Sequence, residues 1–218
     1  MGKVDVYAGE YLLIETVTRE EGERLAGAGA IIGMPVSLTF DAQDDAFRVV
    51  LPNGDSLGTV NPKHRLQLRE ALEEGWTISA CLSLVFYNNH KKSFGGEICY
   101  QMFHVKPNQT AEHANLLAYT EKTHQRIAQG KRPDIALSGQ GWEQVIATGD
   151  WTSDATQPMP IDTKRNSGYA VYKRKRNLAD KLVMASFNKN PAPLIVAGIV
   201  LLAILAGLVY LVVRLIFG

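Results

Sequence analysis

The sequence lacks the short motifs that mark the common hydrolases, nucleotide-binding proteins and metalloproteases. It contains no G-x-S-x-G, no Walker A sequence and no H-E-x-x-H. Its two cysteines form no C-x-x-C pair, and His64, His113 and His124 are scattered, which favours surface positions for these histidines. We therefore expect a protein that is not an enzyme and that holds no metal ion and no cofactor.

Cysteine is nearly absent, and the two that are present have related positions. Cys81 and Cys99 lie in apolar, β-prone runs on either side of the turn-like residues 88–92, which predicts a hairpin. Pairing symmetric about His90 would place Cys81 opposite Cys99, unless Gly95 and Gly96 introduce a bulge. Two interpretations stay open, namely a pair that forms a disulfide on oxidation and two small half-buried residues.

Charge is absent from residues 194–213, LIVAGIVLLAILAGLVYLVV, a run of twenty residues. At a rise of ~1.5 Å per residue, a helix of this length crosses a hydrocarbon core of ~30 Å. Soluble helices of such length normally carry a polar face. We expect a transmembrane helix over residues 191–214, followed by the short tail 215–218.

The formal net charge of +1 hides a strong asymmetry along the chain. Residues 1–160 contain 14 Lys and Arg against 20 Asp and Glu, whereas residues 161–218 contain 9 against 2. Eight of these nine basic residues precede the apolar run, and only Arg214 follows it. The positive-inside rule then predicts a single-pass, tail-anchored protein of the cell (inner) membrane with its N-terminal domain in the cytoplasm.

Residues 161–190 form a basic juxtamembrane segment in this interpretation. As a helix it would place Leu178, Leu182 and Ala185 on one face. Its basic residues would either lie on anionic lipid or serve only to orient the chain, and the two roles are compatible. The candidate membrane-surface residues are Lys173, Arg174, Lys175, Arg176, Lys181 and Lys189.

The apolar run also contains a small-xxx-small pair, Ala203 and Gly207. Such residues let membrane helices approach closely, so we expect a protein partner or a second copy of the chain there, or at the cytoplasmic domain. Nucleic acid is an unlikely partner, because the positive charge lies beside the apolar run while the N-terminal domain is acidic.

The first hundred residues predict a small β domain. Residues 4–7, 11–16, 35–40, 47–51 and 56–60 have strand patterns, and the Asn-Gly of residues 52–55 predicts a tight turn. Residues 19–28 and 63–74 are predicted as a short helical or turn segment and a helix, and a long hairpin around His90 completes the sheet.

Residues 36–75, with VYAGEY before them, resemble the HIRAN domain. The similarity rests on Ala46, Gly54, Leu57, Gly58, Pro62 and Gly75 and extends over about residues 4–106. It implies an OB-like small β-barrel, so the predicted fold class is a mainly β small barrel with accessory helices and one C-terminal transmembrane helix. The resemblance also implies an alternative function, because the family uses this fold to hold the 3′ end of single-stranded DNA.

The chain departs from that family at the residues that hold DNA. Where the family has Tyr and Asp before Ala46, this chain has Ala42 and Gln43. Stacking on an aromatic ring contributes ~1–3 kcal/mol per base, and alanine provides no ring. The side chains that could compensate are Phe40, Phe47, Arg48 and Tyr87, although each also fits a structural role in a barrel.

Residues 108–160 predict an accessory segment after the barrel domain of residues 1–107. Thr110 is a candidate N-cap for a helix over residues 111–129. Apolar clusters at residues 135–137 and 145–147, with Trp142 and Trp151, predict a hairpin that packs against the barrel or docks a partner. The whole chain is therefore interpreted as a non-enzymatic adaptor or accessory subunit of a membrane-associated assembly.

Overall fold

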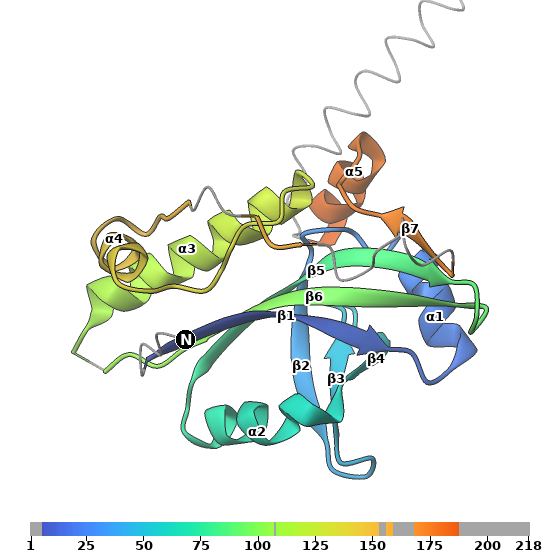
Figure 1. Ribbon diagram of the computed structural model, residues 1–218, viewed down its shortest axis with the longest axis horizontal. Coiled ribbons are helices and arrows are strands. Elements are labelled where there is room, and N and C mark those ends of the chain that lie inside the picture. Colours follow the sequence, from blue (N-terminus) through green and yellow to red (C-terminus); the bar gives the residue numbers. More distant parts are fainter. Residues whose placement is uncertain (1–5, 107, 153–155, 159–167, 188–218) are drawn as a thin grey trace, which may run out of the picture. The chain divides into compact units, whose positions relative to one another are not determined.

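The computed structural model describes residues 6–106, 108–152, 156–158 and 168–187 (Figure 1). The chain divides into two compact units, Met1–Arg176 and Asn177–Gly218. The strands are β1 (Tyr7–Glu15), β2 (Pro35–Asp41), β3 (Ala46–Val50), β4 (Ser56–Val60), β5 (Thr77–Asn88), β6 (Ser93–Phe103) and β7 (Tyr169–Lys173). The helices are α1 (Arg19–Ala26), α2 (Arg65–Glu73), α3 (Thr110–Ala128), α4 (Gln140–Thr148) and α5 (Leu178–Phe187), with a 3-10 turn at Pro62–His64.

Six of the strands pair in a ring. The order is β2-β3-β4-β1-β6-β5, and a further pairing of β2 with β5 joins its two ends. Every pairing is antiparallel. The first unit is therefore mainly β and resembles a small barrel, as the sequence predicted.

Strand β5 is long enough to have a different second neighbour at each end. Ala80 and Cys81 pair with β2, whereas the stretch from Val85 to Asn88 pairs with β7. Strand β7 is thus the seventh strand and extends the sheet beyond the ring. The sequence did not predict this strand, because β7 lies in the segment interpreted as a basic juxtamembrane region.

Local sequence explains the hairpins between β2 and β4. Alternating side chains in β3 leave Phe47 and Val49 buried, as expected for a strand with one face toward a core. The turn after β3 contains Gly54 with φ of 93°, a conformation that glycine adopts without strain. The two short strands expected at residues 4–7 and 11–16 are one strand, β1.

The hairpin of β5 and β6 places Cys81 directly opposite Cys99, which confirms the predicted pair, although Asn88 pairs with Ser93 near the turn, so that the symmetry about His90 holds only beyond the irregularity in the ladder. The irregularity in the ladder lies between Leu82 and Leu84, and not at the two glycines where a bulge was considered. Both thiols are free and fully buried, so the description of these cysteines as half-buried is wrong.

Helix α3 lies across the outer face of β1, β6 and β5 (Figure 1). It begins at Thr110, and Gln109 is its N-cap without a side-chain hydrogen bond, so the prediction of Thr110 as the cap is wrong by one residue. The predicted hairpin after α3 is also wrong, since residues 140–148 form helix α4. Trp142, Val145 and Ile146 recur at helical spacing and pack on α3 and β1.

The last element of the described chain is α5, in the second unit. Asn177 and Asp180 cap its start reciprocally, each accepting a hydrogen bond from the other's backbone amide at 2.9 and 2.8 Å. No helix within the described ranges is long and apolar enough to cross a membrane. The expected span at residues 194–213 lies outside those ranges.

Candidate functional site

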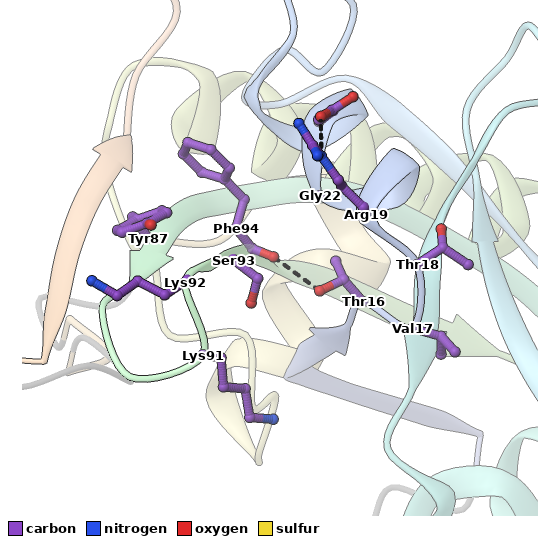
Figure 2. Close-up of a pocket in the computed structure, with 11 residues that line it drawn as sticks. Thr16, Val17, Thr18, Arg19, Gly22, Tyr87, Lys91, Lys92, Ser93 and Phe94 are labelled. Atoms are coloured by element: carbon purple, nitrogen blue, oxygen red, sulfur yellow. Dashed lines mark hydrogen bonds and ion pairs between the residues drawn. The ribbon is translucent and has the colours of Figure 1, made fainter.

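The described part of the chain contains a cleft of about 700 Å³ near β7. One wall comes from the end of β1 and the first turn of α1, and the other from the turn between β5 and β6 (Figure 2). The lining residues are Thr16, Val17, Thr18, Arg19, Gly22, Glu23, Tyr87, Lys91, Lys92, Ser93 and Phe94.

A hydrogen bond and a packing contact join the two walls of the cleft. The Thr16 hydroxyl donates to the carbonyl oxygen of Phe94 at 3.0 Å, which joins the end of β1 to the start of β6. Gly22 faces Phe94, and a Cβ at this position would lie 3.6 Å from the Phe94 nitrogen. This distance is an ordinary van der Waals contact, so α1 packs against the start of β6 at Gly22.

The side chain of Asn88 stabilises the turn between β5 and β6, which carries two exposed lysines. Asn88 Oδ1 accepts hydrogen bonds from the backbone amides of His90 and Lys91 at 3.0 and 3.1 Å. Lys92 has a positive φ of 52°. Lys91 and Lys92 are both exposed, and Figure 2 shows them extending in different directions from the turn.

Two aromatic residues, Tyr87 and Phe94, line the cleft, and Tyr172 of β7 packs against Phe94 from outside the lining. The rings of Tyr87 and Phe94 lie 5.0 Å apart, and those of Phe94 and Tyr172 lie 4.9 Å apart, both edge to face. Tyr172 is 54% exposed, and Val17, which lines the cleft, is 75% exposed. The cleft thus combines exposed apolar groups with cationic ones.

The positive charge of the cleft is only partly neutralised. Arg19 donates to Glu23 at 2.7 Å, so this pair contributes no net charge. Lys91 and Lys92 have no carboxylate partner among the described residues. The lining therefore has a net charge of about +2, although the first 160 residues are acidic.

Several groups at the amino terminus of α1 are paired with one another. Thr18 accepts a hydrogen bond from the amide of Glu21, and the Glu21 carboxylate accepts from the amides of Val17 and Thr18. Partial burial acts to raise the pKa of Glu21, but these amides and the Ser56 hydroxyl lower it overall.

The residues proposed from the family resemblance do not form one site. Arg48 forms ion pairs with Asp41, Asp44 and Glu21, and its guanidinium holds the pKa of Asp41 below the usual range. Phe47 is 2% exposed, and Phe40 packs against it and under Arg69. Only Tyr87 lies in the cleft.

The basic residues expected at a membrane surface are distributed between structural and exposed positions. Lys173 Nζ donates to the carbonyl oxygens of Leu25, Gly27 and Ala30 at 3.1, 2.5 and 3.0 Å. Arg176 Nε donates to the carbonyl of Ile32 at 3.3 Å. These two residues join the chain after β7 to the region around the end of α1.

The other residues of that set have no such structural role in the described contacts. Arg174 and Lys175 are exposed, and Lys181 lies in α5. Lys189, Ala203 and Gly207 lie outside the described residues.

A second polar cluster is buried between the sheet and α3. Glu97 on β6 is 1% exposed and accepts two hydrogen bonds from Arg132, at 2.5 and 3.0 Å. Ser83 donates to the same carboxylate at 2.6 Å, and the Arg132 guanidinium lies 4.0 Å above the ring of Tyr11. Its charged and polar groups are already paired, so this cluster fastens the segment after α3 to the sheet.

Other titratable groups beneath α3 are kept neutral. Burial lowers the pKa of His124 to about 4, with Ser79 Oγ at 3.4 Å from its ring nitrogen. Burial and the neighbouring Cys99 raise the pKa of the Cys81 thiol. The expectation of surface positions is wrong for His64, which is buried, and for His124, which is largely covered. No group of residues suited to hold a metal ion occurs among those described.

Sequence reasoning missed the cleft because its lining comes from two separated segments, residues 16–23 and 87–94. Lys91 and Lys92 belonged to a predicted turn and Phe94 to the β-prone run after it, while Tyr172, which packs against Phe94, belonged to the basic stretch. Only the pairing of β7 with β5 brings Tyr172 beside Phe94. The one local signal was the pair of lysines at the tip of a long apolar hairpin.

Comparisons with known proteins do not assign a family. No protein-family model matches the chain, and no curated protein matches it. A crystal structure of a protein from Lactobacillus plantarum, determined in a structural genomics programme, is similar at 14% identity with a TM-score of 0.32. That likeness covers 45% of this chain and 99% of the other.

Proposed function

We propose that the protein is a non-enzymatic interaction module held at the cytoplasmic face of a membrane by residues 191–214. Its barrel would act as an adaptor or accessory subunit of a membrane-associated assembly, with a protein partner or a second copy of the chain. The observation that carries this proposal is the uncharged run of twenty residues with eight basic residues before it and one after it.

The chemistry of the first unit supports an interaction role. An enzyme needs reactive groups that a substrate can reach, with the pKa of each suited to proton transfer or attack. Here Glu97 is paired and buried, Cys81 and Cys99 are fully buried, and the pKa of His124 lies at about 4. These groups stabilise the fold and do not open into the cleft.

We further propose that the barrel is of the HIRAN or OB-like type. The ring of six antiparallel strands and the positions of Gly58 and Gly75 support this type. Gly58 has φ of 132°, and a Cβ there would lie 2.5 Å from the carbonyl oxygen of Glu15. Glycine is therefore needed where β4 meets β1, at one of the motif positions that carry the resemblance.

Membrane fractionation tests the anchor. The full chain should remain with membranes after extraction with alkaline carbonate, and a variant that lacks residues 191–218 should not. Protease added outside intact cells should leave residues 1–160 intact and should degrade them only after the membrane is opened. Release of the full chain by carbonate would disprove the anchor, and digestion in intact cells would disprove the orientation.

The alternative, a membrane-tethered binder of single-stranded nucleic-acid 3′ ends, has less support. Ala42 and Gln43 replace the family's contacts, Arg48 is held by three carboxylates, and Phe47 is buried. The two functions differ in an assay of the detergent-solubilised full chain with a single-stranded oligonucleotide. Salt-sensitive binding that needs a free 3′ hydroxyl would favour the alternative, and absence of binding at low salt would exclude it.

A further inference from the structure

We propose that the cleft near β7 binds the headgroup of an anionic phospholipid of the membrane that holds the chain. This inference rests on the proposed membrane anchor and names a ligand for a site in the first unit. It concerns Lys91 and Lys92, which lie about 80 residues before the basic stretch that the sequence singled out.

The charge of the cleft is complementary to a lipid phosphate. Lys91 and Lys92 are exposed without carboxylate partners in the described part, and Arg19 and Glu23 neutralise each other on the facing wall. Residues 1–160 carry six more acidic than basic side chains. An anionic leaflet repels such a domain unless the domain turns a basic surface toward it, and this cleft is such a surface.

The exposed side chains at the cleft fit the boundary between headgroups and acyl chains. Val17, which lines the cleft, is 75% exposed, and Tyr172, which packs against the lining residue Phe94, is 54% exposed. Tyrosine is enriched at membrane interfaces because its ring is apolar while its hydroxyl remains hydrated. The cleft thus has an exposed apolar side chain and two lysines in its lining and an exposed tyrosine next to it, which are the residue types that suit the boundary between acyl chains and headgroups.

The contacts among these aromatic rings favour a headgroup over stacked bases. Tyr87, Phe94 and Tyr172 contact one another edge to face at 5.0 and 4.9 Å, so the rings pack mainly on each other. Binding of single strands uses ring faces that are open to successive bases. The cleft volume of about 700 Å³ accommodates a phosphate ester with its polar substituent.

Attachment makes even weak binding effective. When one part of a chain is anchored in the bilayer, a second contact with the same bilayer becomes intramolecular, and its effective concentration is high. The cleft would then fix how the barrel faces the membrane, and so which of its surfaces a partner can reach.

The test uses the full chain in nanodiscs of phosphatidylcholine, with or without phosphatidylserine. Hydrogen exchange of the backbone amides is measured over residues 87–94 at low ionic strength. Phosphatidylserine should slow exchange there by roughly tenfold, and added salt should reverse the effect. Exchange within β1 serves as an internal reference for the integrity of the barrel.

Charge reversal locates the effect. The double variant Lys91→Glu, Lys92→Glu should exchange equally fast in both kinds of disc. The matched control Lys63→Glu, Lys106→Glu makes the same change in net charge at two exposed lysines outside the cleft and should keep the slowing. The neutral variant Lys91→Gln, Lys92→Gln provides a milder change should charge reversal disturb the turn.

Several results would overturn the inference. Equal exchange in both discs, or slowing that survives in both cleft variants, would exclude a lipid site in the cleft. Slowing by inorganic phosphate alone in phosphatidylcholine discs would assign the site to a free anion, and slowing by a single-stranded oligonucleotide would assign it to nucleic acid. Carbonate extraction tests the membrane anchor separately, so different measurements would disprove the anchor and the lipid site.

Discussion

At the scale of single residues, the pair of Glu97 and Arg132 is the most consequential contact in the first unit. Glu97 is 1% exposed, and Arg132 is its bidentate partner. Removal of one partner from a buried ion pair leaves an uncompensated charge, whereas replacement of both by groups of similar volume is often tolerated. The contact joins positions 35 residues apart, so no local pattern could predict it.

We predict that Arg132→Met lowers the free energy of unfolding by about 3–5 kcal/mol, because the Glu97 carboxylate loses its partner while it remains buried. The double variant Arg132→Met, Glu97→Gln should recover most of this loss. Thermal and urea unfolding of the detergent-solubilised chain measure both effects. Arg69→Met is the control, since its pair with Glu73 is exposed and should change stability by less than about 0.5 kcal/mol. A single and a double variant of equal stability would contradict the prediction.

A second residue-scale prediction concerns pH. The pKa of His124 is about 4 in the folded chain and ordinarily near 6.5, so the unfolded state binds more protons between these values. Stability that is present above pH ~6.5 should therefore decline as the pH falls toward ~4, by an amount on the order of 1–3 kcal/mol. His124→Gln should flatten this part of the stability profile. His113→Gln should retain the decline, and an unchanged slope in the His124 variant would show that other groups cause it.

At the scale of elements, the sequence predicted what local patterns determine. Alternation and an Asn-Gly turn specify β2 to β4, and the symmetry about His90 gave the pairing of Cys81 with Cys99. Two elements were missed because their partners are distant. The short apolar clusters around Trp142 have the pattern of strands, and they form helix α4 because they pack against α3. Strand β7 is defined by its pairing with β5, which is far away in the sequence.

The candidate site could also be predicted only in part from local sequence patterns. The sequence named Tyr87 as a candidate for nucleic-acid binding, and this residue lines the cleft, but the sequence grouped it with Phe40, Phe47 and Arg48 because of a resemblance in another segment. The structure separates them, since Arg48 lies among carboxylates and Phe47 in the core. The two walls of the cleft are joined by Thr16 and Phe94, which are 78 residues apart in the sequence, and residue spacing carries no information about that contact.

Strand β7 gives the prediction that belongs to this scale. The ammonium group of Lys173 reaches three backbone carbonyls at and just beyond the end of α1, and cations at helix carboxyl ends are favourable. Lys173→Met keeps the aliphatic stem but removes these charge-assisted bonds, at a cost of roughly 1.5–3 kcal/mol. Hydrogen exchange of residues 169–173 should accelerate by about tenfold or more, while β6 should be unaffected. Lys175→Met, at an exposed position, is the matched control, and equal acceleration in both variants would refute the role of Lys173.

At the scale of the whole molecule, the two parts of the chain have opposite charge and different expected solvents. Residues 1–160 are acidic and form most of a β-rich unit, while the basic residues gather beyond them beside the apolar run. In the proposed arrangement, a domain of this kind would reach its partners through geometry that the membrane imposes. Orientation by the cleft and association through the expected membrane helix are two separate ways to impose it.

The association is open to a direct prediction. Ala203 and Gly207 are four residues apart, so they share one face of the expected helix, and small residues there allow a second helix to approach closely. Ala203→Ile with Gly207→Ile retains the apolar character needed for insertion but blocks that approach. We expect self-association of the full chain in native membranes, measured by energy transfer between labelled copies, to weaken by roughly 1–2 kcal/mol. Ala197→Ile adds similar bulk on a different face and should leave the transfer unchanged. If both variants transfer energy as the original chain does, the partner of the barrel must be sought outside the membrane helix, on the surfaces that an oriented barrel presents.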